Sequence, residues 1–191
     1  VQNNILIDNR GAIRVDFKKL ENIFERSNLF TINVFGKIIK TVGGKEFSPK
    51  KEKTLNCLNV IFSSSFKNTN LGNVNIYLKN KYLFFIRENR NINFKAEIRK
   101  NKKYIFDGRF LLTSKHSGNL IKSNITDLDY VNTDYAFVEY KNEINNVIPF
   151  MFTLEGTTIR PYFNRVDLKS DNKVNCDYNP FHLCLINRLL I

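Results

Sequence analysis

Apolar and polar residues alternate in the first segment, ILIDNRGAIRVDF, on both sides of Asn9-Arg10-Gly11. A period of two is typical of β-strands, and Asn and Gly are common in tight turns. The segment therefore predicts a hairpin. Asp16 can then cap a short helix. The apolar residues on one face of that helix are Phe17, Leu20, Ile23 and Phe24.

Between Leu29 and Val42 the apolar positions recur every three or four residues, which predicts a second helix. Its many β-branched residues lower the helix propensity, but Gly43-Gly44 supplies a C-terminal stop. A third helix is predicted with Ser48 as its N-cap and Pro49 at its first position, and it continues to Phe62.

After Gly72 the period changes to two, and the pattern predicts strands. VNIYLKNKYLFFIRE predicts two strands that turn at Asn80-Lys81, and FKAEIRKNKKYIFDGRFLL predicts a pair that turns between Lys100 and Lys103. VIPFMFTLEGTTIRPYF predicts a pair that turns at Glu155-Gly156, and YAFVEY adds a strand. A short apolar helix is expected from Pro180.

Helices followed by antiparallel strands define an α+β fold. We expect an N-terminal helical lobe, residues 1–90, that ends in a β-hairpin, and a mostly antiparallel β-rich lobe, residues 91–191. With 42% hydrophobic and 25% charged residues, the chain has the composition of a globular protein. It contains no apolar run of about eighteen residues, which excludes an ordinary transmembrane helix.

Charge narrows the choice of partner. The formal net charge of +12 favours a polyanion, either nucleic acid or an acidic membrane surface. The three cysteines, Cys57, Cys176 and Cys184, cannot all pair, and no secretion signal precedes them. This pattern indicates a reducing, cytoplasmic compartment. We expect no membrane partner, and a homodimer stays open.

The stretch TVGGKEFSPKKEK raises the question of a phosphate-binding glycine loop. It lacks the Walker spacing G-x-x-x-x-G-K-[ST]. The pyrophosphatase-type loop, Ser-Gly-Gly-x-Asp-Ser, needs Ser, Asp and Ser at the positions that hold Val42, Glu46 and Phe47 here. The predicted helix stop accounts for the glycines, so the sequence gives no nucleotide site.

The second half of this stretch carries charge at the predicted start of the third helix. Lys50 and Lys51 fall at its second and third positions, where the helix dipole disfavours cations by a few tenths to about 1 kcal/mol each. A carboxylate at the third position would complete a capping box. We therefore hypothesise that Lys45, Lys50, Lys51 and Lys53 contact a nucleic-acid backbone. Solvated lysines that reflect biased codon usage are the alternative.

Other groups of residues do not match a metal-binding or catalytic pattern. Cys176, His182 and Cys184 lack a fourth ligand and a zinc spacing, and Asp127, Asp129 and Asp134 do not follow a calcium loop. We expect no catalytic residue and no metal site. Asp107-Gly108-Arg109 predicts a turn between strands, with Arg109 either paired to an acid or facing RNA. Strand aromatics that could stack on bases, but that fit core packing better, are Phe84, Phe85, Tyr104, Phe106, Tyr135 and Phe137.

Several segments resemble one family. KIIKTVGGKEFSPKKEKTLNCL, followed by TNLGNVNIYLKNKYLFFIRE, resembles the region after the catalytic domain in tRNA(Ile)-lysidine synthetases, particularly the alphaproteobacterial type. FDGRF is similar to the family's Trp-Asp-x-Arg-Phe segment, with Phe106 where Trp is usual, and VIPFMFTLEGTTIRPYF is like its Leu-Pro-aromatic strand pair. The resemblance runs from about Ile13 to Phe163, and the chain's ending departs from the family.

The resemblance implies a function. These ligases use ATP and Mg²⁺ to attach lysine to the wobble cytidine of the isoleucine tRNA anticodon. The ATP loop belongs to an N-terminal domain that this sequence lacks, and the chain starts at Val1, so we expect a C-terminal fragment or truncated product. It would bind tRNA without catalysing the reaction and would need no cofactor of its own. The alternative is a stand-alone basic module that binds RNA or protein. A complete small enzyme is disfavoured.

Overall fold

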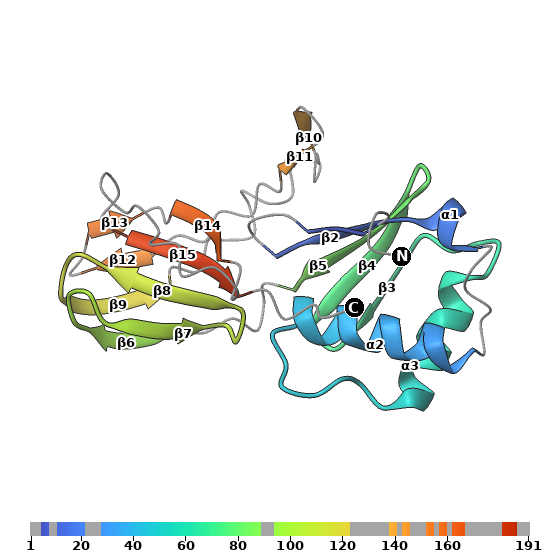
Figure 1. Ribbon diagram of the computed structural model, residues 1–191, viewed down its shortest axis with the longest axis horizontal. Coiled ribbons are helices and arrows are strands. Elements are labelled where there is room, and N and C mark those ends of the chain that lie inside the picture. Colours follow the sequence, from blue (N-terminus) through green and yellow to red (C-terminus); the bar gives the residue numbers. More distant parts are fainter. Residues whose placement is uncertain are drawn as a thin grey trace. The chain divides into compact units, whose positions relative to one another are not determined.

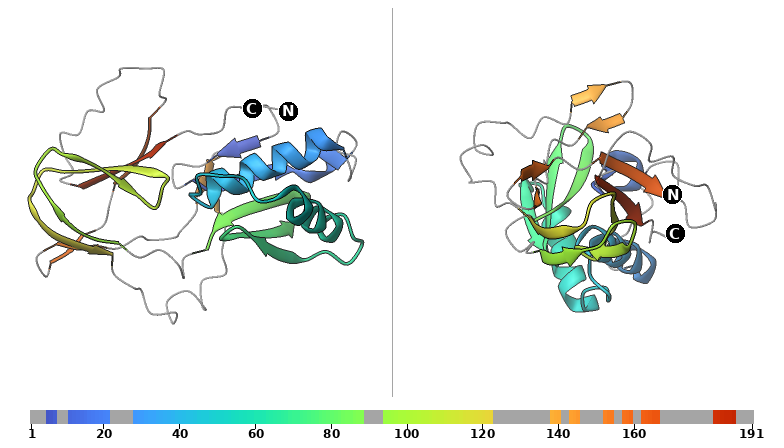
Figure 2. Two further views of the ribbon diagram at one scale, coloured as in Figure 1. Left: turned by 90° about the horizontal axis from the view of Figure 1, so that it is seen from below. Right: turned by 90° about the vertical axis from the view of Figure 1, so that its left-hand side faces the viewer.

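The structure is a computed structural model that describes residues 5–7, 11–21, 28–88, 94–122, 138–140, 143–145, 152–154, 157–159, 162–166 and 181–186. The chain divides into two compact units. Unit 1 is Val1–Asn91 with Arg188–Ile191, and unit 2 is Ile92–Asn187. The described helices lie in unit 1 and are followed by mostly antiparallel strands, so the predicted α+β class is confirmed (Figures 1 and 2).

Unit 1 combines three helices with a five-stranded antiparallel sheet. Its elements are β1 (Ile5–Ile7), β2 (Ile13–Asp16), α1 (Phe17–Glu21), α2 (Leu29–Val42), α3 (Lys51–Ile61), β3 (Asn68–Leu71), β4 (Val74–Lys79) and β5 (Tyr82–Arg87). The strand order is β1-β2-β5-β4-β3. Both predicted hairpins are present, and pairing of β2 with β5 joins them into one sheet.

The core of unit 1 lies between α2, α3 and one face of this sheet (Figure 1). Alternate residues of the central strands form its floor, because successive side chains of a strand point to opposite faces. Phe85 of β5 is fully buried there and packs edge-on against Phe35 of α2, with ring centroids 5.7 Å apart. Leu58 and Ile61 bring the inner face of α3 into the same cluster.

The ends of α2 follow signals in the sequence. At its start, the side-chain oxygen of Asn28 accepts a hydrogen bond of 2.8 Å from the backbone N–H of Phe30. At its end, the N–H of Gly43 donates to the carbonyl of Ile39, and Gly44 has a φ of 64°. Glycine adopts this left-handed conformation without steric cost. The predicted stop at Gly43-Gly44 is confirmed.

The described elements of unit 2 are strands. They are β6 (Lys95–Ile98), β7 (Lys103–Phe106), β8 (Phe110–Ser114), β9 (Gly118–Lys122), β10 (Val138–Tyr140), β11 (Glu143–Asn145), β12 (Phe152–Leu154), β13 (Thr157–Ile159), β14 (Tyr162–Val166) and β15 (Phe181–Ile186). Two four-stranded sheets have the orders β13-β12-β9-β6 and β14-β15-β8-β7, and β10 pairs with β11. The described pairings are antiparallel except that of β14 with β15.

Two predictions for unit 2 were wrong. β6 does not pair with β7: it pairs with β9, and β7 pairs with β8 through a turn at Asp107-Gly108. Both turn residues have positive φ, as a type I′ hairpin turn requires. The helix expected from Pro180 is the strand β15, which inserts between β8 and β14. Such a short segment gains more from two paired neighbours than from an isolated helical turn.

No helix in the described part of the chain is long and apolar enough to cross a membrane.

Candidate nucleic-acid interface

The segment between α2 and α3, residues 43–50, runs back along α2 (Figure 1). We call it the basic connection. Near its start, the N–H of Lys45 donates a hydrogen bond of 3.0 Å to the carbonyl of Lys40. Near its end, the Cβ of Ser48 lies 3.5 Å from the position that a Cβ on Gly36 would take. The connection is therefore fixed against α2 at two points.

The glycine pair of the basic connection packs against another backbone segment. A Cβ on Gly43 would lie 2.2 Å from the carbonyl oxygen of Gly72, in the turn between β3 and β4. Gly72 has a φ of +61°, and a Cβ there would lie 2.9 Å from the side chain of Ile39. These glycines allow two backbones to approach closely. The helix stop and this close packing account for the glycine pair.

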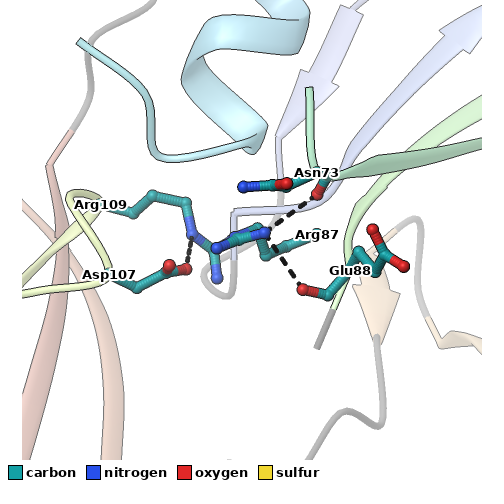
Figure 3. A network of polar contacts seen from close by, with 5 residues as sticks. All are labelled: Asn73, Arg87, Glu88, Asp107 and Arg109. Atoms are coloured by element: carbon teal, nitrogen blue, oxygen red, sulfur yellow. Dashed lines mark hydrogen bonds and ion pairs between the residues drawn. The ribbon is translucent and has the colours of Figure 1, made fainter. Parts of the chain in front are cut away.

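The same turn is held from β5 by Arg87, a residue that sequence reasoning did not single out (Figure 3). Arg87 is only 6% exposed, and its Nη1 donates to the carbonyls of Asn73, at 3.2 Å, and Glu88, at 3.1 Å. The N–H of Glu88 also donates to the Asn73 carbonyl, at 2.9 Å. The Gly72-Asn73 turn is therefore contacted by Gly43 on one side and is hydrogen-bonded to Arg87 and Glu88 on the other. An arginine inside an apolar strand, YLFFIR, was the signal that could have predicted this role.

The start of α3 differs from the prediction. The helix begins at Lys51, with Lys50 in the N-cap position and no side-chain capping bond, so Ser48 is not the cap. Packing explains the shift, because Ser48 lies against Gly36 and Pro49 lies near Gly72. Lys51 and Lys53 consequently occupy the first and third helical positions with Glu52 between them. Two cations still lie in the first turn, where the helix dipole disfavours them.

The four lysines of the hypothesis are all exposed. They are Lys45, Lys50, Lys51 and Lys53. Among the described residues, no acidic side chain forms an ion pair with any of their ammonium groups. From residue 37 to residue 53 the chain carries six lysines and two glutamates. These residues therefore carry a net positive charge, and the four lysines lie on two consecutive segments, the basic connection and the first turn of α3.

An exposed aromatic side chain lies among these lysines. Phe47 is 77% exposed, more than any other large apolar side chain in the described ranges. From the sequence, Phe47 was a mismatch to a nucleotide loop and the aromatic residue of the family resemblance, but it was not predicted to bind a ligand. The sequence position of Phe47 could have predicted its exposure, because an aromatic residue in a charged, glycine-containing connection has few apolar neighbours to pack against.

Arg109 lies elsewhere, in the turn between β7 and β8 of unit 2. It is 3% exposed, and its Nε donates a 2.7 Å charge-assisted hydrogen bond to the carboxylate of Asp107 (Figure 3). Its guanidinium also lies 4.8 Å from the ring centroid of Phe110. Of the two alternatives left open by the sequence, the structure favours the acidic partner. We therefore place Arg109 outside the candidate interface.

The other candidates lie partly outside the described residues. Within the described residues, no cluster of side chains is suited to a metal ion. Cys176 and the three aspartates Asp127, Asp129 and Asp134 lie outside them. Cys57 is buried on the inner face of α3, and burial raises the pKa of its thiol to about 11. Such a thiol is a poor nucleophile near neutral pH.

The strand aromatics are largely core residues, as expected. Phe84, Phe85 and Phe106 are buried, and the hydroxyl of Tyr104 accepts a hydrogen bond from the N–H of Arg99. Tyr135 and Phe137 lie outside the described residues.

No protein-family model, curated protein or solved structure matches the chain.

Proposed function

We propose that the chain is the tRNA-binding, C-terminal portion of a tRNA(Ile)-lysidine synthetase, and that the basic connection and the first turn of α3 contact the tRNA backbone. One observation carries this proposal: Lys45, Lys50, Lys51 and Lys53 are exposed, without acidic partners in the described part of the chain, on the basic connection and the first turn of α3. The family comes from the sequence resemblance, and the geometry supplies a surface suited to phosphate groups.

The electrostatics of the surface support phosphate as its ligand. Each lysine that neutralises a phosphate releases condensed counterions, which gives affinity that depends on salt. At the start of α3 no side chain caps the backbone N–H groups, and the helix dipole there favours an anion. A phosphate near Lys51 would relieve the unfavourable interaction between that cation and the dipole. Contacts of this kind position an RNA without reading its bases.

The chemistry of the ligase belongs to a different part of such an enzyme. In this proposal, ATP and Mg²⁺ are bound by the N-terminal catalytic domain, and the residues of this chain bind and orient the tRNA. The chain by itself should therefore bind isoleucine tRNA and should not attach lysine to it.

Charge reversal tests the proposal. We expect the triple variant Lys50→Glu, Lys51→Glu, Lys53→Glu to bind an isoleucine tRNA transcript at least tenfold more weakly. The slope of log K against log[salt] should become shallower by about 2–3, because up to three phosphate contacts are lost. Filter binding across a salt series measures both quantities.

A matched control keeps the change in net charge the same. The variant Lys95→Glu, Lys102→Glu, Lys103→Glu reverses three exposed lysines of unit 2. It should retain most of the affinity and the salt slope. Equal losses in both triples, or no loss in the first, would contradict the assigned interface. Equal affinity of the parent chain for tRNA and for an unrelated RNA duplex would favour the stand-alone basic module instead.

A further inference from the structure

Phe47 is exposed on a segment whose neighbouring residues contact other parts of unit 1. The residues before it are held by the contact of Gly43 with Gly72, and Ser48 and Pro49 after it pack on Gly36 and Gly72. The ring therefore lies between two points at which the chain contacts the rest of unit 1. Leaving a phenylalanine this exposed forgoes the favourable burial of its apolar surface. A ligand that covers the ring would recover that free energy.

The surroundings of Phe47 indicate what kind of ligand this is. Its flanking residues are charged, with Lys45 and Glu46 before it and Lys50 shortly after it, all exposed. Protein-docking surfaces have apolar centres from which charged residues are depleted, and a single ring with a lysine two residues before it and another three residues after it does not fit that description. Aromatic rings interspersed with cations are instead characteristic of surfaces that bind unpaired nucleotides, where cations hold phosphates and rings stack on bases.

We infer that Phe47 stacks on an unpaired nucleobase of the RNA whose phosphates contact the neighbouring lysines. This inference rests on the proposed function and adds a base contact to it. Stacking tolerates any base, because every base has a π-face. It also requires a base outside a continuous helix, since paired bases are already stacked on each other. The site therefore selects for a loop, bulge or single-stranded end next to a backbone segment.

The absence of tryptophan from the chain allows a direct test. In the variant Phe47→Trp, the introduced residue is the only tryptophan, and stacking on a base should quench its fluorescence when the isoleucine tRNA transcript is added. The control Val60→Trp places a tryptophan at an exposed position, 46% accessible, near the far end of α3. It should show little quenching at the same saturation. Quenching in both variants, or in neither, would overturn the inference.

Affinity supplies the second readout. Phe47→Ala should weaken tRNA binding roughly tenfold, as expected for loss of one stacked base, and should leave the salt slope unchanged because no charge is altered. Phe47→Tyr should restore the affinity. Circular dichroism should show parent-like folding, since the side chain is exposed. Affinity for a fully paired RNA duplex should not respond to either variant.

The outcomes separate the two proposals. If the parent chain binds tRNA and charge reversal weakens it, while Phe47→Ala binds like the parent, the stacking inference is wrong and the proposed function stands. If the parent chain does not bind tRNA, both are wrong. If Phe47→Ala instead weakens tRNA and duplex binding equally, the ring supports the shape of the connection rather than a base contact, and the inference is again wrong.

Discussion

The turn between β3 and β4 and the basic connection touch each other through Gly72 and Gly43, yet they use cations in opposite ways. In the turn, Arg87 is buried and its guanidinium donates to two backbone carbonyls. In the connection, Lys45 and Lys50 extend into solvent without acidic partners among the described residues. The cation at the β3–β4 turn thus stabilises the fold, whereas the cations of the basic connection are exposed to solvent.

The difference follows the chemistry of the two side chains. A guanidinium is planar, weakly hydrated and carries several donors, so it can be buried where carbonyls satisfy it. An ammonium group is strongly hydrated and usually stays at the surface while its methylenes cover apolar atoms. Arg14 and Arg109 are buried as well, whereas no lysine with described burial is. The net charge of the chain is therefore a poor guide to its interface until the buried arginines are set aside.

The largest effect is expected where the two regions touch. Gly43→Ala places a Cβ 2.2 Å from the Gly72 carbonyl oxygen and 2.8 Å from that of Ile39, so the backbone must move. We expect the free energy of unfolding to fall by about 3 kcal/mol or more. Urea unfolding followed by circular dichroism measures it.

Gly36→Ala is the matched control, because its Cβ would make only an ordinary contact of 3.5 Å with Ser48. Alanine is the better helix former, so this variant should be unchanged or more stable by about 0.5–1 kcal/mol. If Gly43→Ala were as stable as Gly36→Ala, the two regions would not be in the close contact described.

The second-largest effect is expected from removal of the buried cation, Arg87. Arg87→Met keeps much of the side-chain volume but removes the donors to the Asn73 and Glu88 carbonyls. The expected loss is about 2 kcal/mol, typical of hydrogen bonds made by a charged group. Hydrogen exchange should speed up at the amides of β3 and β4 in particular.

Arg99→Met, at an exposed arginine, serves as the control and should change stability by less than about 0.5 kcal/mol. Because Arg87 lies outside the proposed interface, tRNA affinity measured on the folded Arg87→Met protein should equal that of the parent. If the Arg87→Met protein were folded but bound tRNA more weakly, the distinction between the structural Arg87 and the proposed tRNA-binding lysines would be wrong.

Local patterns predicted much of unit 1. Periodicity and the Gly43-Gly44 stop located α2, and Asn80-Lys81 located the turn between β4 and β5, because these signals act over a few residues. Pairing between strands that are distant in the sequence was harder to predict. β6 and β7 follow each other along the chain and have the pattern of a hairpin, yet their partners are β9 and β8. Which strand supplies a partner depends on tertiary structure, and this also made β15 a strand instead of a helix.

The candidate interface was predicted in part. The lysines were found because local charge is visible in the sequence, but the start of α3 was placed at the wrong residue. Ser48 and Pro49 have the residue types of a helix start, and packing on Gly36 and Gly72 shifts the helix to Lys51. Arg87 and Phe47 were missed for a common reason. Their roles depend on burial and exposure, which a single sequence does not report for one residue.

The smallest expected effect is that of Lys51→Glu. It separates a cation that serves the fold from one that serves a ligand, because the stability of the protein should rise while its tRNA affinity falls. Lys51 occupies the first position of α3, where the dipole disfavours a cation. Lys51→Glu should therefore raise the free energy of unfolding by about 0.3–1 kcal/mol at low salt. The same change places a carboxylate where the proposal puts a phosphate, so tRNA affinity should fall severalfold.

Lys79→Glu is the control, since Lys79 is exposed at the end of β4 and is not part of α3. It should alter neither quantity appreciably. If Lys51 served only the fold, its substitution would lower the stability of the protein. If Lys51 were merely solvated, the substitution would raise stability through the helix dipole but would leave tRNA affinity unchanged. Greater stability together with weaker tRNA binding is expected only if the cation at the start of α3 serves a ligand. Weaker binding accompanied by lower stability would assign Lys51 to the fold instead.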